Sequence, residues 1–260
     1  MSTPRLTALI TGASSGIGRD LARRFAADGH DVVLVARRAD ALRGLADDLS
    51  AQHHVQARPL AADLTKPDAP MRIAKELSGA GIGVEIVVNN AGFGLQGTVA
   101  ELPLERQLEM IQVNVAALTA LTRIFLPAIL QRNRGGILNV ASTAAFQPGP
   151  LMAVYYATKA YVESFTEALA EELRGTALRI SCLCPGPTVT GFAEAAAMTD
   201  TNLFRGSTMT SADVARIGYD GWKTGKVLIV PGLSNKIGMS VVRMSPRPMV
   251  RRVVKRLNGR

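Results

Sequence analysis

The sequence predicts a single α/β domain built on a doubly wound, mostly parallel sheet of seven strands. Seven short apolar runs alternate with stretches of helical periodicity, a pattern typical of parallel sheets covered by helices. The first apolar run leads into a glycine-rich turn that opens a helix. The chain has 260 residues, 47% of them hydrophobic, so one domain with one core accounts for its length.

The glycine-rich turn is the stretch Thr11-Gly12-Ala13-Ser14-Ser15-Gly16-Ile17-Gly18, between a predicted strand over Leu6–Ile10 and a helix. Glycines let a backbone turn tightly and approach a diphosphate, while the first N–H groups of the helix face that anion. The stretch therefore predicts a nucleotide site. The alternative is a turn that only joins strand to helix.

The second strand, Asp31–Ala36, ends in Arg37-Arg38 with no acidic residue. An acid near this point binds a free ribose 2′-hydroxyl, whereas arginine matches a 2′-phosphate. We therefore predict NADP(H) as the cofactor, with Arg37 the principal contact and Arg38 a weaker one. The alternative is a pair of solvated arginines before the helix Ala39–Ser50.

Two further strand ends carry polar residues. Val55–Leu60 is followed by Asp63 and Leu64, where Asp63 by itself suits a helix N-cap. Val84–Val88 leads into Asn89-Asn90-Ala91-Gly92, which suits a backbone that passes close to a ribose, and which alone is also a plausible turn.

The fifth strand, within Gly136–Ser142, delivers Ser142 at its carboxyl end, where ligands bind in open parallel sheets. Tyr155 and Lys159 follow, four residues apart and so on one face of a helix. We expect the Lys159 ammonium to favour the Tyr155 phenolate and so bring the pKa of that phenol towards working pH. The sixth strand, Leu178–Leu183, runs into Pro185-Gly186-Pro187-Thr188-Val189-Thr190, and Lys226–Val230 is the seventh.

Over residues 5–232 the chain resembles the short-chain dehydrogenase/reductase family. The resemblance rests on TGASSGIG, NNAG, Ser142 with the Tyr-x-x-x-Lys motif, and the Pro-Gly loop, and the chain is similar to a bacterial branch near 3-ketoacyl and hydroxysteroid reductases. The resemblance implies a Rossmann-like fold, with residues 1–232 as the NADP(H)-binding catalytic domain. It implies that Ser142 binds the substrate carbonyl, that Tyr155 is the acid/base, and that Lys159 holds the nicotinamide ribose. Asn114, on a predicted helix from Pro103 to Leu130, would hold a water near Lys159; a structural amide at a helix kink is the competing role.

The resemblance also supplies the full set of expected cofactor contacts. It implies a substrate lid over about 188–210, whose apolar composition favours an acyl, steroid or terpenoid substrate, and a homodimer or homotetramer paired through the helices that carry Asn114 and Tyr155. Thr188 departs from the hydrophobic residue of the family loop. The expected cofactor contacts are Gly12, Ser14, Ser15, Gly16, Ile17, Gly18, Arg37, Arg38, Asp63, Leu64, Asn90, Ala91, Gly92, Tyr155, Lys159, Pro185, Gly186, Thr188 and Thr190.

The net charge of +9 arises from the end of the chain. Residues 221–260 hold ten of the 30 basic residues and none of the 21 acidic ones, so the rest of the chain is nearly neutral. A neutral body argues against a nucleic-acid partner. Residues 233–260 are expected to be a basic helical extension, with Met249, Val250, Val253, Val254 and Leu257 forming one apolar stripe. Residues 246–260 could contact a membrane weakly, although packing on the body or on a partner subunit is the favoured role.

Neither a metal site nor a membrane span is predicted. Cys182 and Cys184 share one face of a strand as small core residues, and the three histidines have no accompanying ligand cluster. No apolar run of about 18 residues and no secretory segment is found, so we expect a cytoplasmic protein. The expected activity is hydride transfer between NADPH and a carbonyl; the alternative is an NADP(H)-binding regulatory or scaffolding protein.

Overall fold

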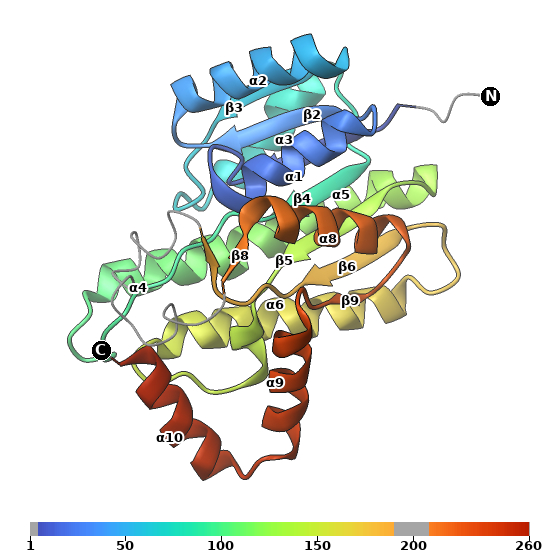
Figure 1. Ribbon diagram of the computed structural model, residues 1–260. Coiled ribbons are helices and arrows are strands. Elements are labelled where there is room, and N and C mark those ends of the chain that lie inside the picture. The colour runs from blue at the N-terminus through green and yellow to red at the C-terminus, as the bar shows by residue number, and fades with distance from the viewer. Residues whose placement is uncertain (1–4, 190–207, 260) are drawn as a thin grey trace.

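The computed structural model describes residues 5–189 and 208–259. Its main sheet confirms the predicted fold class, because seven strands pair in parallel in one open sheet (Figure 1). In spatial order they are β3 (Ala57–Ala61), β2 (Asp31–Ala36), β1 (Thr7–Thr11), β4 (Ile86–Asn89), β5 (Gly136–Val140), β6 (Arg179–Leu183) and β9 (Leu228–Ile229). Two short strands, β7 (Thr188–Val189) and β8 (Met209–Thr210), form a separate parallel pair.

Helices cover both faces of the sheet, and neighbouring strand residues point into different layers. Ala8 and Ile10 of β1 pack with α1 (Gly16–Ala27), α2 (Ala39–His53) and α8 (Ser211–Lys223). Leu9, between them, packs on the opposite side with α3 (Ala69–Gly79), α5 (Leu118–Arg132) and α6 (Ala153–Glu172). This alternation buries both faces of each strand, which explains why the strands read as continuous apolar runs.

The predicted helix from Pro103 to Leu130 is three segments in series: α4 (Leu104–Ile111), a π-helical stretch (Gln112–Ala117) and α5. By length and mean hydropathy Leu104–Arg132 could cross a membrane, a property that the search for apolar runs missed. Its contacts place it in the core, since Val113, Ala117 and Leu121 pack in the layer beneath the sheet.

A chain of buried amides and hydroxyls crosses the middle of the sheet. Asn89 of β4 aligns with Asn139 of β5, and the Asn89 Nδ2 donates to the Asn139 Oδ1 at 2.9 Å and to the Thr122 Oγ1 at 3.0 Å. Asn139 Nδ2 in turn donates to the Thr166 Oγ1 at 2.9 Å. This network connects the centre of the sheet to α5 and α6.

The basic extension folds as two helices, α9 (Leu233–Met244) and α10 (Arg247–Asn258). α9 runs away from the body and α10 returns towards it (Figure 1). The five residues of the expected apolar stripe on α10 differ in their environments. Val250 and Val254 are buried on the body, whereas Met249, Val253 and Leu257 are exposed, because they lie on a neighbouring face of the helix.

Candidate active site

The sequence-predicted residues gather in a cleft of about 740 Å³ at the carboxyl ends of the strands. Open parallel sheets bind ligands at this edge. The cleft lining includes the expected residues Gly12, Ser14, Ser15, Gly16, Ile17, Gly18, Arg37, Arg38, Asp63, Leu64, Asn90, Ala91, Gly92, Ser142, Tyr155, Lys159, Pro185, Gly186 and Thr188. Thr190 and most of the predicted lid lie outside the described residues.

The glycine turn brings the start of α1 to the floor of the cleft. A Cβ on Gly18 would lie 2.3 Å from the Asn90 Nδ2 and 2.4 Å from the Gly12 carbonyl oxygen, so only glycine fits. Gly12 and Gly16 have φ of +69° and +54°, which favours glycine as well. Ser15 is the N-cap residue of α1, but its side chain makes no capping bond. The Ser15 side chain therefore does not cap the first N–H groups of α1, and a helix N-terminus of this kind suits an anion.

The two arginines after β2 border the cleft and differ in their contacts. Arg38 Nη2 donates to the Ser14 carbonyl oxygen and to the Ser14 Oγ, both at 3.1 Å, so it spans from β2 to the glycine turn. Arg37 lies near Asp63. Partial burial opposes ionisation of Asp63, but hydrogen bonds from Thr65 and the charge of Arg37 outweigh it and lower the pKa of the carboxyl.

Asn90 and Asn114 hold the loop after β4. Asn90 Nδ2 donates to the Thr11 carbonyl oxygen at 2.9 Å, which ties the loop to the glycine turn. Asn114 is buried in the π-helical stretch, where its Oδ1 accepts from the Phe93 N–H at 3.1 Å. Its Nδ2 donates to the Phe93 carbonyl oxygen and to the Thr158 Oγ1, both at 3.0 Å. Asn114 therefore ties the loop after β4 to α6, and both its expected role at a helix kink and its link to Lys159 through water stay predictions.

Ser142, Tyr155 and Lys159 meet at the end of β5. Ser142 caps a short 3₁₀ turn, where its Oγ accepts from the Ala144 N–H at 3.1 Å, and it hydrogen-bonds to the Tyr155 side chain. Lys159, one turn further along α6, donates to the Val140 carbonyl oxygen at 2.8 Å. Its Nζ is 5.9 Å from the centre of the Tyr155 ring. A hydroxyl, a phenol and an ammonium thus converge on one side of the cleft.

The protonation of Tyr155 differs from the sequence expectation. Burial raises the pKa of Tyr155 and outweighs the opposing hydrogen bond with Ser142. Burial lowers the pKa of Lys159 to about 8. The four-residue spacing of Tyr155 and Lys159 shows that they share a helix face, but it does not show how deeply the phenol is buried by other elements of the fold. The phenol is therefore neutral at working pH, which is the form of a proton donor.

The loop after β6 closes another side of the cleft. Thr143 N–H donates to the Pro185 carbonyl oxygen at 2.9 Å, and Thr188 Oγ1 donates to the Gly186 carbonyl oxygen at 2.9 Å. A Cβ on Gly186 would lie 2.5 Å from the Asn235 amide of α9, so the extension packs directly on this loop.

Some residues around the cleft were not predicted from the sequence. Phe93, Arg106, Gln147, Met152 and Tyr156 line it beyond the expected set. No family motif or regular spacing marks them, since the fold brings them together from separate elements. Asn258, near the end of the chain, was also missed: its Oδ1 accepts from the Tyr156 hydroxyl at 3.0 Å, and its Nδ2 donates to the Pro150 carbonyl oxygen at 3.0 Å.

Residues 6–200 match the family model described as short chain dehydrogenase. The chain belongs to this family. An uncharacterized oxidoreductase of Myxococcus xanthus is 39% identical over 69% of the chain and 71% of that protein. The very-long-chain 3-oxoacyl-CoA reductase of Rattus norvegicus is 34% identical over 70% of the chain, and the match spans only 60% of the rat protein.

Solved structures of the family share this fold. A short-chain dehydrogenase from Sphingobium yanoikuyae in complex with NADPH superposes with a TM-score of 0.81 at 32% identity, covering 92% of this chain and 94% of the other. A short-chain dehydrogenase/reductase from Burkholderia phymatum in complex with NAD also gives 0.81, at 27% identity and coverage of 94% and 93%. Both nicotinamide cofactors therefore occur among its structural relatives.

The cleft fits the nicotinamide cofactor of this family. The glycine turn offers a cradle without side chains and an uncapped helix N-terminus for the diphosphate. Ser142, Tyr155 and Lys159 lie on the same cleft, at the carboxyl end of β5 and the start of α6. Within residues 5–189 and 208–259, no group of three His, Cys, Asp or Glu side chains is arranged to hold a metal ion.

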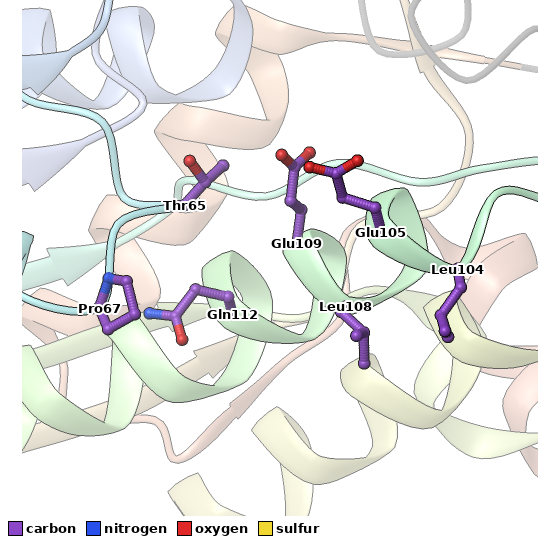
Figure 2. A pocket seen from close by; sticks show the side chains of 7 residues that line it. All are labelled: Thr65, Pro67, Leu104, Glu105, Leu108, Glu109 and Gln112. Carbon is purple, nitrogen blue, oxygen red and sulfur yellow. The ribbon is translucent and has the colours of Figure 1, made fainter.

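A second depression of about 420 Å³ lies beside α4 (Figure 2). Figure 2 shows the Glu105 and Glu109 side chains pointing the same way from that helix, with Thr65 and Pro67 on a neighbouring loop. Its lining combines two carboxylates and two leucines with Thr65, Pro67 and Gln112. It therefore does not bring a serine, a tyrosine and a lysine together as the cleft does. The cleft, with its convergent reactive groups, is the candidate active site.

Proposed function

We propose that the protein is an NADPH-dependent reductase of an apolar carbonyl substrate of the 3-oxoacyl thioester class. The observation that carries the proposal is the neutral, buried phenol of Tyr155 hydrogen-bonded to Ser142, with the Lys159 ammonium one helical turn away. The family assignment supports an oxidoreductase.

The three side chains divide the work of carbonyl reduction. When bound, the cofactor supplies the hydride that the carbonyl carbon receives. Ser142 donates a hydrogen bond to the carbonyl oxygen and holds it beside the Tyr155 hydroxyl. Tyr155 gives its proton to that oxygen, which becomes the alcohol, and the positive charge of Lys159 stabilises the resulting phenolate until solvent returns a proton. Lys159 also binds the nicotinamide ribose.

The preference for NADPH over NADH is proposed from the end of β2. Arg37 and Arg38 border the cleft where a 2′-phosphate would lie, and no acidic residue follows the strand before Asp40. Because Arg38 already contacts the glycine turn, it is fixed near the diphosphate site, while Arg37 extends beside Asp63. The NADPH complex of the Sphingobium relative supports this choice.

The substrate class is proposed from the cleft and from the relatives. Phe93, Ala144 and Met152 give the cleft an apolar part, which favours an acyl chain. Arg106, also on the cleft, lies with its guanidinium carbon 5.1 Å from the Phe93 ring centre. A cation beside an apolar wall suits a thioester that joins an acyl chain to a phosphate-bearing carrier. The name of the rat relative points to the same chemistry.

The protein is further proposed to form a homodimer, in keeping with the pairing expected of α4, α5 and α6. Leu104, Leu108 and Ile111 are exposed on α4, as is Tyr161 on α6. Exposed apolar side chains on these helices suit a buried interface. Light scattering that shows only monomer would contradict this proposal.

The test follows NADPH oxidation with 3-oxoacyl, steroid and terpenoid ketones, and small polar ketones as comparison. Tyr155→Phe is expected to lower kcat about 10²- to 10⁴-fold, the range of general acid catalysis, with the Kd of NADPH changed less than threefold. Tyr161→Phe, a substitution of an exposed tyrosine on the same helix, is the matched control and should retain wild-type rates.

Wild-type turnover by Tyr155→Phe would contradict the mechanism. Tight NADPH binding by the wild type without turnover of any ketone would instead favour the regulatory or scaffolding role.

A further inference from the structure

The extension α9–α10 has an inner side that is fixed to the body. Val250 and Val254 pack with Met152 and Tyr156, and the Asn258 side chain is fully buried and hydrogen-bonded. The Gln96 Nε2 adds a hydrogen bond of 2.6 Å to the Asn258 carbonyl oxygen. The helices are therefore held in one orientation, which determines the surface that they present outward.

Each of the two helices carries exposed large apolar side chains, which we define together as the outer face. On α9 the spacing is four, four and three residues, and on α10 it is four and four, so each set lies on one side of its helix. Met244, at the end of α9, is 88% exposed. The outer face consists of Leu233, Ile237, Val241 and Met244 of α9 and Met249, Val253 and Leu257 of α10.

Basic residues accompany these apolar side chains. The two helices and the turn between them contain seven arginines and lysines, and residues 221–260 contain no acidic residue. Large exposed apolar side chains with a basic border are the composition of helices that lie in the interface of a membrane. The basic residues are Lys236, Arg243, Arg247, Arg251, Arg252, Lys255 and Arg256, all of them exposed.

The positive charge of the outer face decides whether a second copy of the chain or an anionic lipid surface binds there. A second copy of the chain meeting it face to face would bring seven cations against seven cations, and like charges across an interface oppose association. An anionic lipid surface attracts the same cations and accepts the apolar side chains among its headgroups. We propose that the outer face of α9 and α10 docks the protein on the surface of an anionic bilayer.

The experiment uses the full chain and sucrose-loaded vesicles, one set of phosphatidylcholine alone and one with 30% phosphatidylglycerol. The wild type is expected to sediment with the anionic vesicles at least tenfold more than with the neutral ones, and less as salt rises. Two triple variants test the face. Ile237→Gln, Val241→Gln, Val253→Gln removes apolar side chains, and Arg251→Gln, Arg252→Gln, Lys255→Gln removes charge; each should bind anionic vesicles at least tenfold more weakly.

The matched control is Arg43→Gln, Arg72→Gln, Arg174→Gln, which removes three exposed charges from the body and should bind like the wild type. Circular dichroism and NADPH binding verify that every variant is folded. Equal loss of binding in the body control would overturn the proposal in favour of general charge attraction. Failure of the wild type to bind anionic vesicles would overturn it as well. An oligomer that dissociates only in the outer-face variants, with no vesicle binding, would assign the surface to a second copy.

The measurement of vesicle binding does not depend on turnover, so docking and the proposed reductase activity can fail separately.

Discussion

Lys159 has a proposed catalytic role, and its buried charge lowers the stability of the fold. Replacing it by methionine tests the effect on stability and the effect on activity separately. Its ammonium is buried and donates to the Val140 carbonyl oxygen at 2.8 Å. Burial lowers the pKa of Lys159 from 10.5 to about 8. Methionine has similar length without the charge, so Lys159→Met removes the buried cation and keeps most of the packing.

The magnitude follows from proton linkage. Between pH 8 and 10.5 the unfolded chain holds a proton that the folded lysine has lost, so stability rises with pH through that window. At pH 7 the buried charge costs ~3 kcal/mol, and at pH 9.5 this cost falls to ~1 kcal/mol. Leaving the Val140 carbonyl without its donor costs the variant about 1 kcal/mol at either pH. Lys159→Met should therefore be more stable than the wild type by ~2 kcal/mol at pH 7 and nearly equal to it at pH 9.5.

Urea unfolding at the two pH values measures this difference directly, with tryptophan fluorescence as the signal. Carbonyl reduction should fall sharply in the same variant. A variant that is less stable than the wild type at pH 7, or a stability difference that does not change with pH, would refute the account of Lys159 as a buried cation.

Three further predictions address the cofactor turn, the arginines and the anchor of the extension. Gly18→Ala places a Cβ 2.4 Å from the Gly12 carbonyl oxygen, so it should lower the free energy of unfolding in urea by at least about 2 kcal/mol and weaken NADPH binding. The control Gly44→Ala, whose Cβ meets none of the described neighbouring residues within 4 Å, should raise the free energy of unfolding by about 0.5–1 kcal/mol. Replacing Arg37 and Arg38 by Asp should lower kcat/KM with NADPH at least tenfold, because each charge-assisted hydrogen bond contributes about 1.5–3 kcal/mol, and should leave kcat/KM with NADH little changed. Equal losses with both cofactors would argue against a contact with the 2′-phosphate. Asn258→Leu should lower the free energy of unfolding by about 1–3 kcal/mol because it leaves the buried Tyr156 hydroxyl without its acceptor, and adding Tyr156→Phe should restore at least about 1 kcal/mol. Additive losses in the double variant would show that this hydrogen bond does not account for the effect.

Much of the fold could be predicted because local patterns decide it. The parallel strands are short apolar runs, and the glycine turn is recognised by its spacing between a strand and a helix. The N-cap of α8 is also local, since the Thr210 Oγ1 accepts from the Asp213 N–H at 3.1 Å. The same holds for the shared face of Tyr155 and Lys159.

Features that depend on contacts between residues far apart in the chain could not be predicted from the sequence. The pKa of Tyr155 is raised by what surrounds it, and no spacing in the sequence reports that burial. The apolar positions of α10 look like one stripe in sequence, and only the docked helix shows that Val250 and Val254 face inward while Val253 faces outward. Asn258 was missed because its partners are Tyr156 and Pro150, more than a hundred residues away.

The paired amides of Asn89 and Asn139 have a consequence for how the chain chooses its native strand alignment. β4 and β5 are apolar on both faces, so hydrophobic burial alone discriminates poorly between alignments that differ by two residues. A slip of that size would break the hydrogen bond between the two buried amides, and it would shift Ser142 by about 6.6 Å along the strand. One buried amide pair thus penalises misaligned folding intermediates, and the alignment that it selects is the one that puts the serine beside the tyrosine.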